Sequence, residues 1–499
     1  MLKQKKKEFF HRRFLKGNAK KRRVLHALIF ITMLLIMAAA SLCEIGDLEQ
    51  ILFHISRPVS GVDPFYVYKF TAAIIFGGTG LFFAMIFVMG VIYRLIRKPK
   101  KHFSWYHVFS LKDKIYIRIL SMGLAFSVLF FIVYMFMPLG IAGYIKKLNA
   151  PFSGYYEENY KAPEKTLIRL PEKNNLIVIH LESMERAYFN REIFGDNLAP
   201  NLERMANSNI SFKGYRQVKG TGWTIGGLFS LYCGVPLKAA LPGSGKRNKN
   251  DFFTNIKSLP NILKEHGYRT YYMQGADLRF SGKNRFLEQH GFDVMYGRED
   301  LQSRNDYIED FDGDWGVNDH ALFEYVKKKL TEIAEEKKPF FMAFLTVDTH
   351  GPDGFLNDKC EEKFDDKFKN VLACSDELLN DFIIWLEKQS FYKDTVIVIL
   401  GDHLAMHNTL YDRLEQAENR EIVNVIINSR KNTGNLKRVF TMFDLMPTLI
   451  ESMGGEIEGR RLGLGVSLFS EKKTLIEKEG FKAFNENIYA KSLMYEEFR

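Results

Sequence analysis

The chain has 499 residues and a formal net charge of +11, and it is long enough for more than one domain. The positive charge is concentrated near the start, because residues 3–23 alone contain eleven Lys and Arg side chains. Without that block the chain is close to charge-balanced, which argues against a nucleic-acid-binding protein. Such a block beside an apolar run is typical of the cytoplasmic flank of a membrane segment.

Three long apolar runs follow the basic block, at residues 24–43, 70–93 and 115–140. Each is long enough to cross a bilayer as a helix, which takes about 20 residues. A buried core helix is the alternative for a single run, but three in succession favour membrane spans. The first run is too long for a signal peptide, and two more runs follow it. We therefore predict an N-terminal bundle of three transmembrane helices within residues 1–145.

The loops between these runs predict their orientation. The 94–114 connection carries seven Lys and Arg residues, whereas the 44–69 connection carries only Arg57 and Lys69. Because positively charged loops stay in the cytoplasm, we expect the N-terminus and the 94–114 loop on the cytoplasmic side. Three spans then place everything after about residue 145 on the outer side of the membrane.

The outer region alternates predicted strands with predicted helices. Short apolar runs typical of buried strands occur at 174–182, at the start of 339–352 and in 394–403. Helical patterns at 258–268 and 316–338 lie between them. This alternation predicts an α/β fold with a mostly parallel sheet flanked by helices on both faces.

The outer region also suggests boundaries. Residues 146–172 have mixed polarity and three prolines, so we predict a linker there. The catalytic domain is then expected at 173–470, with a C-terminal tail at 471–499. Two cysteines of this region, Cys360 and Cys374, could form a disulfide in an oxidising compartment, although free thiols are the alternative.

Polar side chains follow three of the predicted strands. Glu182 ends the first, His350 follows the second, and Asp402 and His403 follow the third. A lone carboxylate after a strand is usually a helix cap, but strand ends of one parallel sheet share one edge. Glu182, Asp402 and His403 could therefore hold one divalent cation. Mixed oxygen and nitrogen ligands suit Mn²⁺ or Zn²⁺, and Mg²⁺ is also compatible.

The segment "GTGWTIGGLFSLYCGVP" at 220–236 has the form of a turn that runs into a helix. Thr224 would lie in the first helical turn, where phosphate is attracted to free N–H groups. A metal could lower the pKa of its hydroxyl and make Thr224 a nucleophile and a fourth ligand. A simple capping role for Thr224 is equally compatible with the spacing. The segment is not a P-loop, since the required Lys is missing, and we expect its glycines to bring backbone close to a phosphate.

Several segments resemble the alkaline phosphatase/sulfatase superfamily. They include "APNLERMANSNISF" at 199–212, "LPNILKEHGYRT" at 259–270, "GDH" at 401–403 and "FDLMPTLIESMGG" at 443–455. The stretches "HLESMERAYFN", "YYMQGADLRFSGKNRFLEQHGFDVMYG" and "LTVDTHGPDGF" are similar to one bacterial branch, the phosphoglycerol transferases of the osmoregulated periplasmic glucan type. Lipoteichoic acid synthases form a related branch. The resemblance covers about residues 174–470.

This resemblance implies a site and a chemistry. The family's metal and nucleophile positions fall on Glu182, Thr224, Asp402 and His403, and its phosphoryl-contacting histidine falls on His350. The implied reaction moves glycerol phosphate from phosphatidylglycerol to an envelope oligosaccharide, such as a glucan, through a covalent intermediate on threonine. One divalent metal is expected, since a second ligand set is incomplete. The implied location is the bacterial inner membrane, with a periplasmic catalytic domain.

Departures from the family pattern refine this expectation. Lipoteichoic acid synthases have His, Trp and Arg where this chain has Gln274, Ser281 and Lys283, which argues for single transfers rather than polymerisation. Sulfatases need C-x-P-x-R, and "CGVPLK" at 233–238 does not match it, so Cys233 is expected to be structural.

Further substrate contacts are predicted near these positions. The predicted substrate-binding residues are Gln274, Lys283, Arg279, Trp223, Trp315 and His407. Core packing, turn formation or a solvated basic loop would explain several of them equally well. A phosphoethanolamine transferase acting on lipid A or an envelope sugar is the alternative enzyme, and a catalytically inactive envelope sensor is the alternative of another class.

Overall fold

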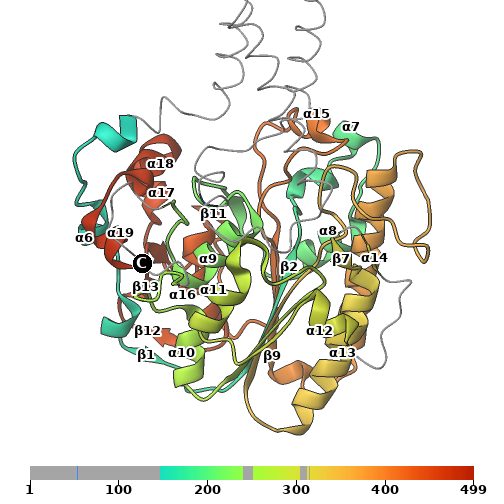
Figure 1. Cartoon of the computed structure of the whole chain (residues 1–499), viewed down its shortest axis with the longest axis horizontal. Helices are drawn as coiled ribbons and strands as arrows, with labels where there is room; N and C mark the ends of the chain where they lie inside the picture. Colours follow the sequence, from blue (N-terminus) through green and yellow to red (C-terminus); the bar gives the residue numbers. More distant parts are fainter. Residues whose placement is uncertain (1–52, 54–145, 240–250, 304–311, 314) are drawn as a thin grey trace, which may run out of the picture. The chain divides into compact units, whose positions relative to one another are not determined.

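A computed structural model describes Phe53 and residues 146–239, 251–303, 312–313 and 315–499 (Figure 1). They belong to one compact unit, made of residues 49–61 and 145–499. The predicted spans at 24–43, 70–93 and 115–140 lie outside the described residues. Among the described helices, none is both long and apolar enough to cross a membrane.

The centre of the unit is a mixed six-stranded sheet in the order β10-β9-β2-β8-β4-β5. Only β10 runs antiparallel to its neighbour, and the other four pairings are parallel. The predicted parallel sheet is therefore confirmed, with one antiparallel edge strand added. In order across the sheet, the strands are Asn424–Ile427, Thr395–Gly401, Asn175–Leu181, Phe340–Leu345, Arg269–Gln274 and Val294–Tyr296.

Helices cover both faces of the sheet, because alternate residues of the central strands enter two different cores. Leu176 and Val178 of β2 face one core, while Ile177 and Ile179 face the other. The first core is covered by α9 (Thr224–Cys233), α10 (Leu259–Glu265), α11 (Lys283–Gln289) and α16 (Met442–Ser452). The second is covered by α8 (Pro200–Ser208), α13 (Asp319–Glu335) and α14 (Lys367–Glu387), as Figure 1 shows.

Shorter elements complete the unit. The remaining strands are β1 (Ile168–Arg169), β3 (Lys213–Tyr215), β6 (Asp312–Gly313), β7 (Gly316–Val317), β11 (Lys437–Phe440), β12 (Glu456–Ile457), β13 (Arg461–Leu462) and β14 (Gly465–Val466). The remaining α-helices of the described region are α6 (Tyr155–Asn159), α7 (Arg191–Phe194), α12 (Arg298–Gln302), α15 (Tyr411–Leu414), α17 (Leu475–Glu479), α18 (Phe481–Tyr489) and α19 (Leu493–Glu497).

The segment expected to be a linker is folded against the segment expected to be a tail. The Tyr156 hydroxyl of α6 donates a hydrogen bond to the Ile488 carbonyl of α18 at 2.6 Å, and Tyr156 is fully buried. Strand β1 pairs with β12. Buried tyrosines that sequence polarity did not reveal thus hold both segments in the compact unit. The wider division of the chain into domains stays a prediction.

The cysteines of the described region occupy two different environments. Cys360 and Cys374 form a disulfide, which joins the loop after His350 to α14. Cys233 is a buried thiol in α9, and burial raises its pKa well above the usual range. A buried protonated thiol is inert, so its structural role is supported.

Candidate active site

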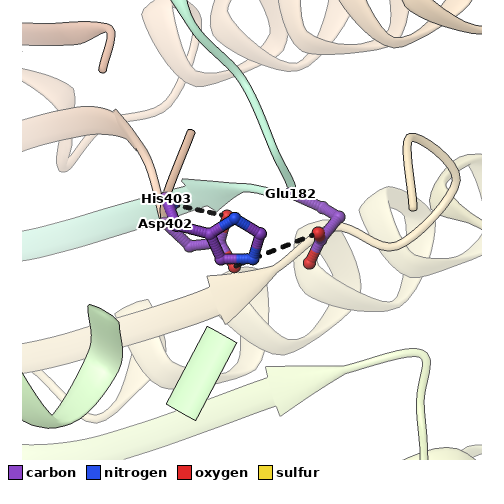
Figure 2. A group of neighbouring side chains, drawn as sticks. All are labelled: Glu182, Asp402 and His403. Atoms are coloured by element: carbon purple, nitrogen blue, oxygen red, sulfur yellow. Dashed lines mark hydrogen bonds and ion pairs between the residues drawn. The ribbon is translucent and has the colours of Figure 1, made fainter. Parts of the chain in front are cut away.

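Glu182, Asp402 and His403 meet at the carboxyl edge of the sheet (Figure 2). Strands β2 and β9 are parallel neighbours with Leu181 opposite Gly401, so the residues that follow them emerge side by side. His403 Nε2 lies 3.5 Å from Glu182 Oε1 and 3.4 Å from Asp402 Oδ2. One ligand atom from each of the three residues lies within 4.8 Å of the others, and all three side chains are buried.

Neighbouring groups orient these ligand atoms. Asp402 Oδ1 accepts two backbone N–H bonds, from Ser183 and His403, each at 2.9 Å. His403 Nδ1 lies 2.8 Å from the Leu404 carbonyl, so Nδ1 carries a proton and Nε2 is the nitrogen that a cation can reach. Asp402 Oδ2 and His403 Nε2 are buried without a hydrogen-bond partner in the described part of the chain. Two carboxylates and one imidazole, each of the last two residues with one atom that lacks a hydrogen-bond partner, fit a divalent cation.

The electrostatics of the group also favour a cation. Burial and the adjacent Glu182 carboxylate raise the pKa of Asp402 to about 7. Burial raises the pKa of Glu182 too, but His403 and the hydrogen bond from Ser183 outweigh this effect and hold it below its usual range. Two buried carboxylates so close together cannot both ionise easily, and a bound cation would remove that conflict.

Thr224 is the first residue of α9, and its Oγ1 lies 3.3 Å from Glu182 Oε2. The residue at the N-cap position is Trp223, and no side chain caps this helix. The hydroxyl of Thr224 is therefore directed to the metal-ligand group rather than used as a cap. Thr221 differs, because its buried hydroxyl donates to the Val218 carbonyl at 2.8 Å within the preceding turn.

Two glycines of this segment have a packing role. A Cβ atom at Gly227 would lie 2.1 Å from the Asp402 carbonyl oxygen, and one at Gly226 would lie 2.9 Å from the Gly220 carbonyl oxygen. Both glycines thus permit close contact of backbone with backbone. Gly227 lets α9 lie directly against the loop that carries Asp402, whereas the approach of these glycines to a phosphate stays a prediction.

A pocket opens beside Thr224. Six predicted site residues line it: Glu182, Thr224, Gln274, Lys283, Trp315 and His350. The Trp315 ring lies 4.3 Å from the His350 ring and 5.8 Å from Phe280. Aromatic rings thus form one wall of the pocket, beside the metal-ligand group.

Two basic side chains in this pocket have pKa values shifted by burial. Burial lowers the pKa of Lys283 to about 8, and the carboxylates of Glu182 and Asp402 oppose the shift, so Lys283 is charged at neutral pH. Burial also lowers the pKa of His350, which is therefore neutral there. His350 Nδ1 lies 2.8 Å from the Gly351 carbonyl, so Nδ1 carries the proton and Nε2 is left as an acceptor.

The structure places the other predicted substrate contacts elsewhere. Arg279 forms ion pairs with Asp277 and Glu299 at the surface. His407 stacks on Tyr411 with ring centroids 5.4 Å apart. None of these residues lines the pocket.

Two further predicted contacts have mainly packing roles. Trp223 is buried and lies near the Phe53 ring at 6.4 Å rather than in the pocket wall. Gln274 does line the pocket, but its Nε2 donates to the carbonyls of Ala276 and Asp277, so it mainly holds that turn. Substrate contact by these residues stays a prediction.

Three residues of the site were not predicted. Phe280 lines the pocket, Ser183 donates its hydroxyl to Glu182 Oε1 at 2.7 Å, and the Thr346 hydroxyl accepts the Glu182 N–H at 2.9 Å. Thr346 follows β8 directly, so its place at a strand end could have identified it. Ser183 has a φ of 54°, a conformation that non-glycine residues seldom adopt and that no sequence pattern revealed.

Comparison with known proteins defines the class. The α/β architecture, with a mixed sheet flanked by helices, agrees with a profile of the Sulfatase family, which matches residues 174–455. The chain belongs to that family. It is 37% identical over 328 residues to phosphoglycerol transferase I of Escherichia coli O6:K15:H31 (strain 536 / UPEC) and, to the same extent, to that of Shigella flexneri.

These matches are partial. Each covers 64% of this chain but only 41% of the relative, so the chain matches less than half of their length. Among solved structures, the lipoteichoic acid synthase LtaP from Listeria monocytogenes is 21% identical, with a TM-score of 0.49, over 65% of this chain and 80% of that one.

Proposed function

We propose that this protein is a phosphotransferase that moves glycerol phosphate from phosphatidylglycerol to an envelope oligosaccharide, such as a glucan. The observation that carries the proposal is the Thr224 hydroxyl, 3.3 Å from Glu182 and beside two buried ligand atoms that lack partners. The 37% identity to proteins named phosphoglycerol transferase I supports the choice of transferred group.

Glu182, Asp402, His403 and Thr224 Oγ1 would hold one divalent cation, Mn²⁺ or Zn²⁺, with Mg²⁺ also compatible. When bound, the cation supplies Lewis-acid activation and lowers the pKa of a coordinated hydroxyl. The chain itself supplies orientation. Ser183 and the backbone around Asp402 fix the carboxylates, and the start of α9 fixes Thr224 against Glu182.

The proposed reaction has two half-reactions. In the first, Thr224 Oγ1 bonds to phosphorus, the bond from phosphorus to the diacylglycerol oxygen breaks, and diacylglycerol takes up the proton that Thr224 loses. In the second, an acceptor hydroxyl oxygen bonds to phosphorus and the glycerophospho-threonine bond breaks. Neutral His350, with Nε2 as an acceptor, is suited to take the acceptor's proton, which returns to Thr224.

Pocket charge favours glycerol over ethanolamine as the transferred head group. Lys283 is the cation in the pocket, and among the described lining residues Glu182 is the sole carboxylate. An ethanolamine ammonium would therefore meet a like charge and would compete for a metal ligand. A neutral glycerol can instead lie against Phe280 and Trp315, while Lys283 attracts the phosphate.

The test follows head-group transfer in the purified full-length protein. With labelled phosphatidylglycerol we expect diacylglycerol release and a glycerophosphoryl adduct on Thr224, detected by peptide mass spectrometry. Thr224→Ala should lose the adduct, while Thr221→Ala, in the turn before α9, should keep it. Transfer from phosphatidylethanolamine alone, or an adduct that survives Thr224→Ala, would contradict the proposal.

The predicted setting completes the proposal. Three spans would anchor the chain in the bacterial inner membrane, with the N-terminus cytoplasmic and the described unit periplasmic. The disulfide between Cys360 and Cys374 suits that oxidising compartment. Mass spectrometry of envelope glycans from cells with and without the protein should show a glycerol-phosphate increment on the acceptor, and nucleic acid is not an expected partner.

A further inference from the structure

Arg420, in the connection between α15 and β10, is held by two separate segments of the chain. Its Nε and Nη2 both donate to the Glu185 carboxylate, at 3.0 and 2.8 Å to Oε2. Nη2 also donates to the Ala405 carbonyl at 2.7 Å. Glu185 is fully buried, and the Arg420 side chain is 17% exposed. One nitrogen atom therefore contacts both segments.

Each of these segments carries ligands of the candidate metal site. Glu185 lies three residues after Glu182, and Ala405 lies two residues after His403. We propose that Arg420 is a positioning residue that sets the separation of the two ligand-bearing segments and thereby the affinity of the site for its cation. The inference rests on the proposed metal site, but it does not depend on which group is transferred.

The contact of Arg420 with the two ligand-bearing segments lies beyond the end of the sheet. Strand β2 ends at Leu181 and β9 at Gly401, and their backbone pairing ends with the hydrogen bond from the Asp402 N–H to the Leu181 carbonyl at 3.2 Å. Beyond that point an isolated bridge joins Glu185 to Ile422, and the Leu404 N–H is accepted by Gln217 Oε1 at 2.7 Å. The Ser183 N–H joins the two segments next to the ligands, by donating to Asp402 Oδ1 at 2.9 Å. Arg420 joins them again farther from the sheet, through Glu185 and the Ala405 carbonyl.

The same side chain also supports the loop that follows the ligands. Its guanidinium lies 5.3 Å from the centre of the Tyr411 ring, and that ring stacks with His407. The His407 carbonyl lies so close to Gly351 that a Cβ there would be 2.6 Å away. His407 thus forms part of the support behind the turn that carries His350.

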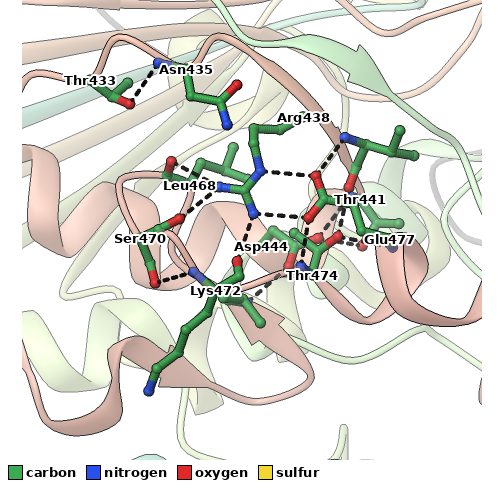
Figure 3. Close-up of polar contacts among 12 residues, drawn as sticks. Thr433, Asn435, Arg438, Thr441, Asp444, Leu468, Ser470, Lys472, Thr474 and Glu477 are labelled. Carbon is green, nitrogen blue, oxygen red and sulfur yellow. Dashed lines mark hydrogen bonds and ion pairs between the residues drawn. The ribbon is translucent and has the colours of Figure 1, made fainter.

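The chain offers a matched control in a second buried arginine–carboxylate pair (Figure 3). Arg438 donates to Glu477 from Nε at 2.9 Å and from Nη2 at 3.0 Å, and it is 5% exposed. Its other donors contact the carbonyls of Leu468, Ser470 and Lys472. None of these contacts involves a ligand-bearing segment. Lysine at either position keeps the charge but loses the two-pronged geometry.

The experiment compares the full-length wild type with Arg420→Lys and Arg438→Lys. Each protein is stripped of metal with a chelator, and Mn²⁺ binding is then measured by isothermal titration calorimetry, beside the melting temperature of the metal-free form. Both variants should melt at a lower temperature than the wild type. Only Arg420→Lys should bind Mn²⁺ more weakly, by about 10- to 100-fold, as expected when a group that supports metal ligands is lost.

Three outcomes would overturn the inference: unchanged Mn²⁺ affinity in Arg420→Lys, an equal loss in Arg438→Lys, or no Mn²⁺ binding by the wild type. If Arg420→Lys does not fold, Glu185→Gln provides the second variant, since it keeps the side-chain shape while it removes the charge that holds the guanidinium. It should also weaken Mn²⁺ binding, and wild-type affinity in that variant would equally contradict the role of Arg420. Failure of head-group transfer would leave these results unaffected.

Discussion

The Glu182–Asp402–His403 group is buried and the Arg438–Glu477 pair largely so, yet they differ in how fully their polar atoms are hydrogen-bonded (Figures 2 and 3). Every nitrogen of the Arg438 guanidinium donates to a carbonyl or carboxylate. Both Glu477 oxygens accept at least two hydrogen bonds. In the other group, Asp402 Oδ2 and His403 Nε2 have no hydrogen-bond partner in the described region.

This difference in hydrogen bonding distinguishes a structural network from a candidate metal site. An unpartnered buried polar atom costs free energy, so a network that serves only the fold satisfies its own members. The ligand group instead keeps acceptors directed at one point, which a bound cation can satisfy. The contrast predicts that changes at the ligand group should mainly affect function, whereas changes at the Arg438 network should mainly affect stability.

Asp402→Asn should show this contrast most strongly. The amide oxygen can still accept the N–H groups of Ser183 and His403, while its Nδ2 can donate to His403 Nε2, 3.4 Å from the atom it replaces. Transfer activity should fall by at least about 10²- to 10³-fold, the loss that follows removal of one preorganised electrostatic group. The metal-free variant should be as stable as the wild type in urea unfolding, since a buried charge has been removed.

The same variant also tests the cation directly. Mn²⁺ at a hundred times its Kd should raise the unfolding free energy of the wild type by about 2.7 kcal/mol. Asp402→Asn should show no such rise. A variant that remains active, or one that is strongly destabilised without metal, would show that the group is a structural network like that of Arg438.

Gly227→Ala should have a smaller effect than Asp402→Asn, and it should lower both the stability of the fold and the affinity for Mn²⁺. The added methyl group would lie 2.1 Å from the Asp402 carbonyl, so α9 must move away from the ligand loop. We expect a loss of about 1–3 kcal/mol in unfolding free energy, as for other overpacked sites, together with weaker Mn²⁺ binding. Gly434→Ala is the control, because a Cβ there has nothing within 4 Å. Equal effects of the two substitutions would argue against close packing of α9 on the ligand loop.

The sequence could predict the ligand group because its residues follow two apolar strands directly. Parallel strands that are both buried end at one edge of a sheet, so the position of Asp402 relative to Glu182 follows from the strand pattern. The same logic identified His350. The fold class was accessible for the same reason, whereas the antiparallel edge strand β10 was not, because its four residues carry no signal of direction.

The residues that hold the ligand-bearing segments in place could not be predicted from the strand pattern. Arg420 and Glu185 are 235 residues apart, and their contact depends on where two irregular segments lie after the sheet ends. The role of Gly227 depends on a long-range neighbour as well, because it faces the Asp402 carbonyl. Local patterns give residue types and strand ends, but they do not give contacts between loops that are distant in sequence.

The smallest expected effect is a dependence of stability on pH. It arises from Asp444, which lies in the first turn of α16 beside the Arg438 network. Burial raises the pKa of Asp444 to about 7, although the N–H groups of Thr441 and Val466 lower it. The folded state therefore binds a proton between about pH 4 and pH 7 that the unfolded chain releases, so stability should fall as pH rises through that window. Urea unfolding between pH 4 and pH 7 should show this fall in stability in the wild type. Asp444→Asn should show a flatter pH dependence. It should also be less stable overall, because one carboxylate oxygen is replaced by a donor. An unchanged slope in Asp444→Asn would mean that this carboxyl is ionised in the folded state and that its three hydrogen bonds outweigh its burial.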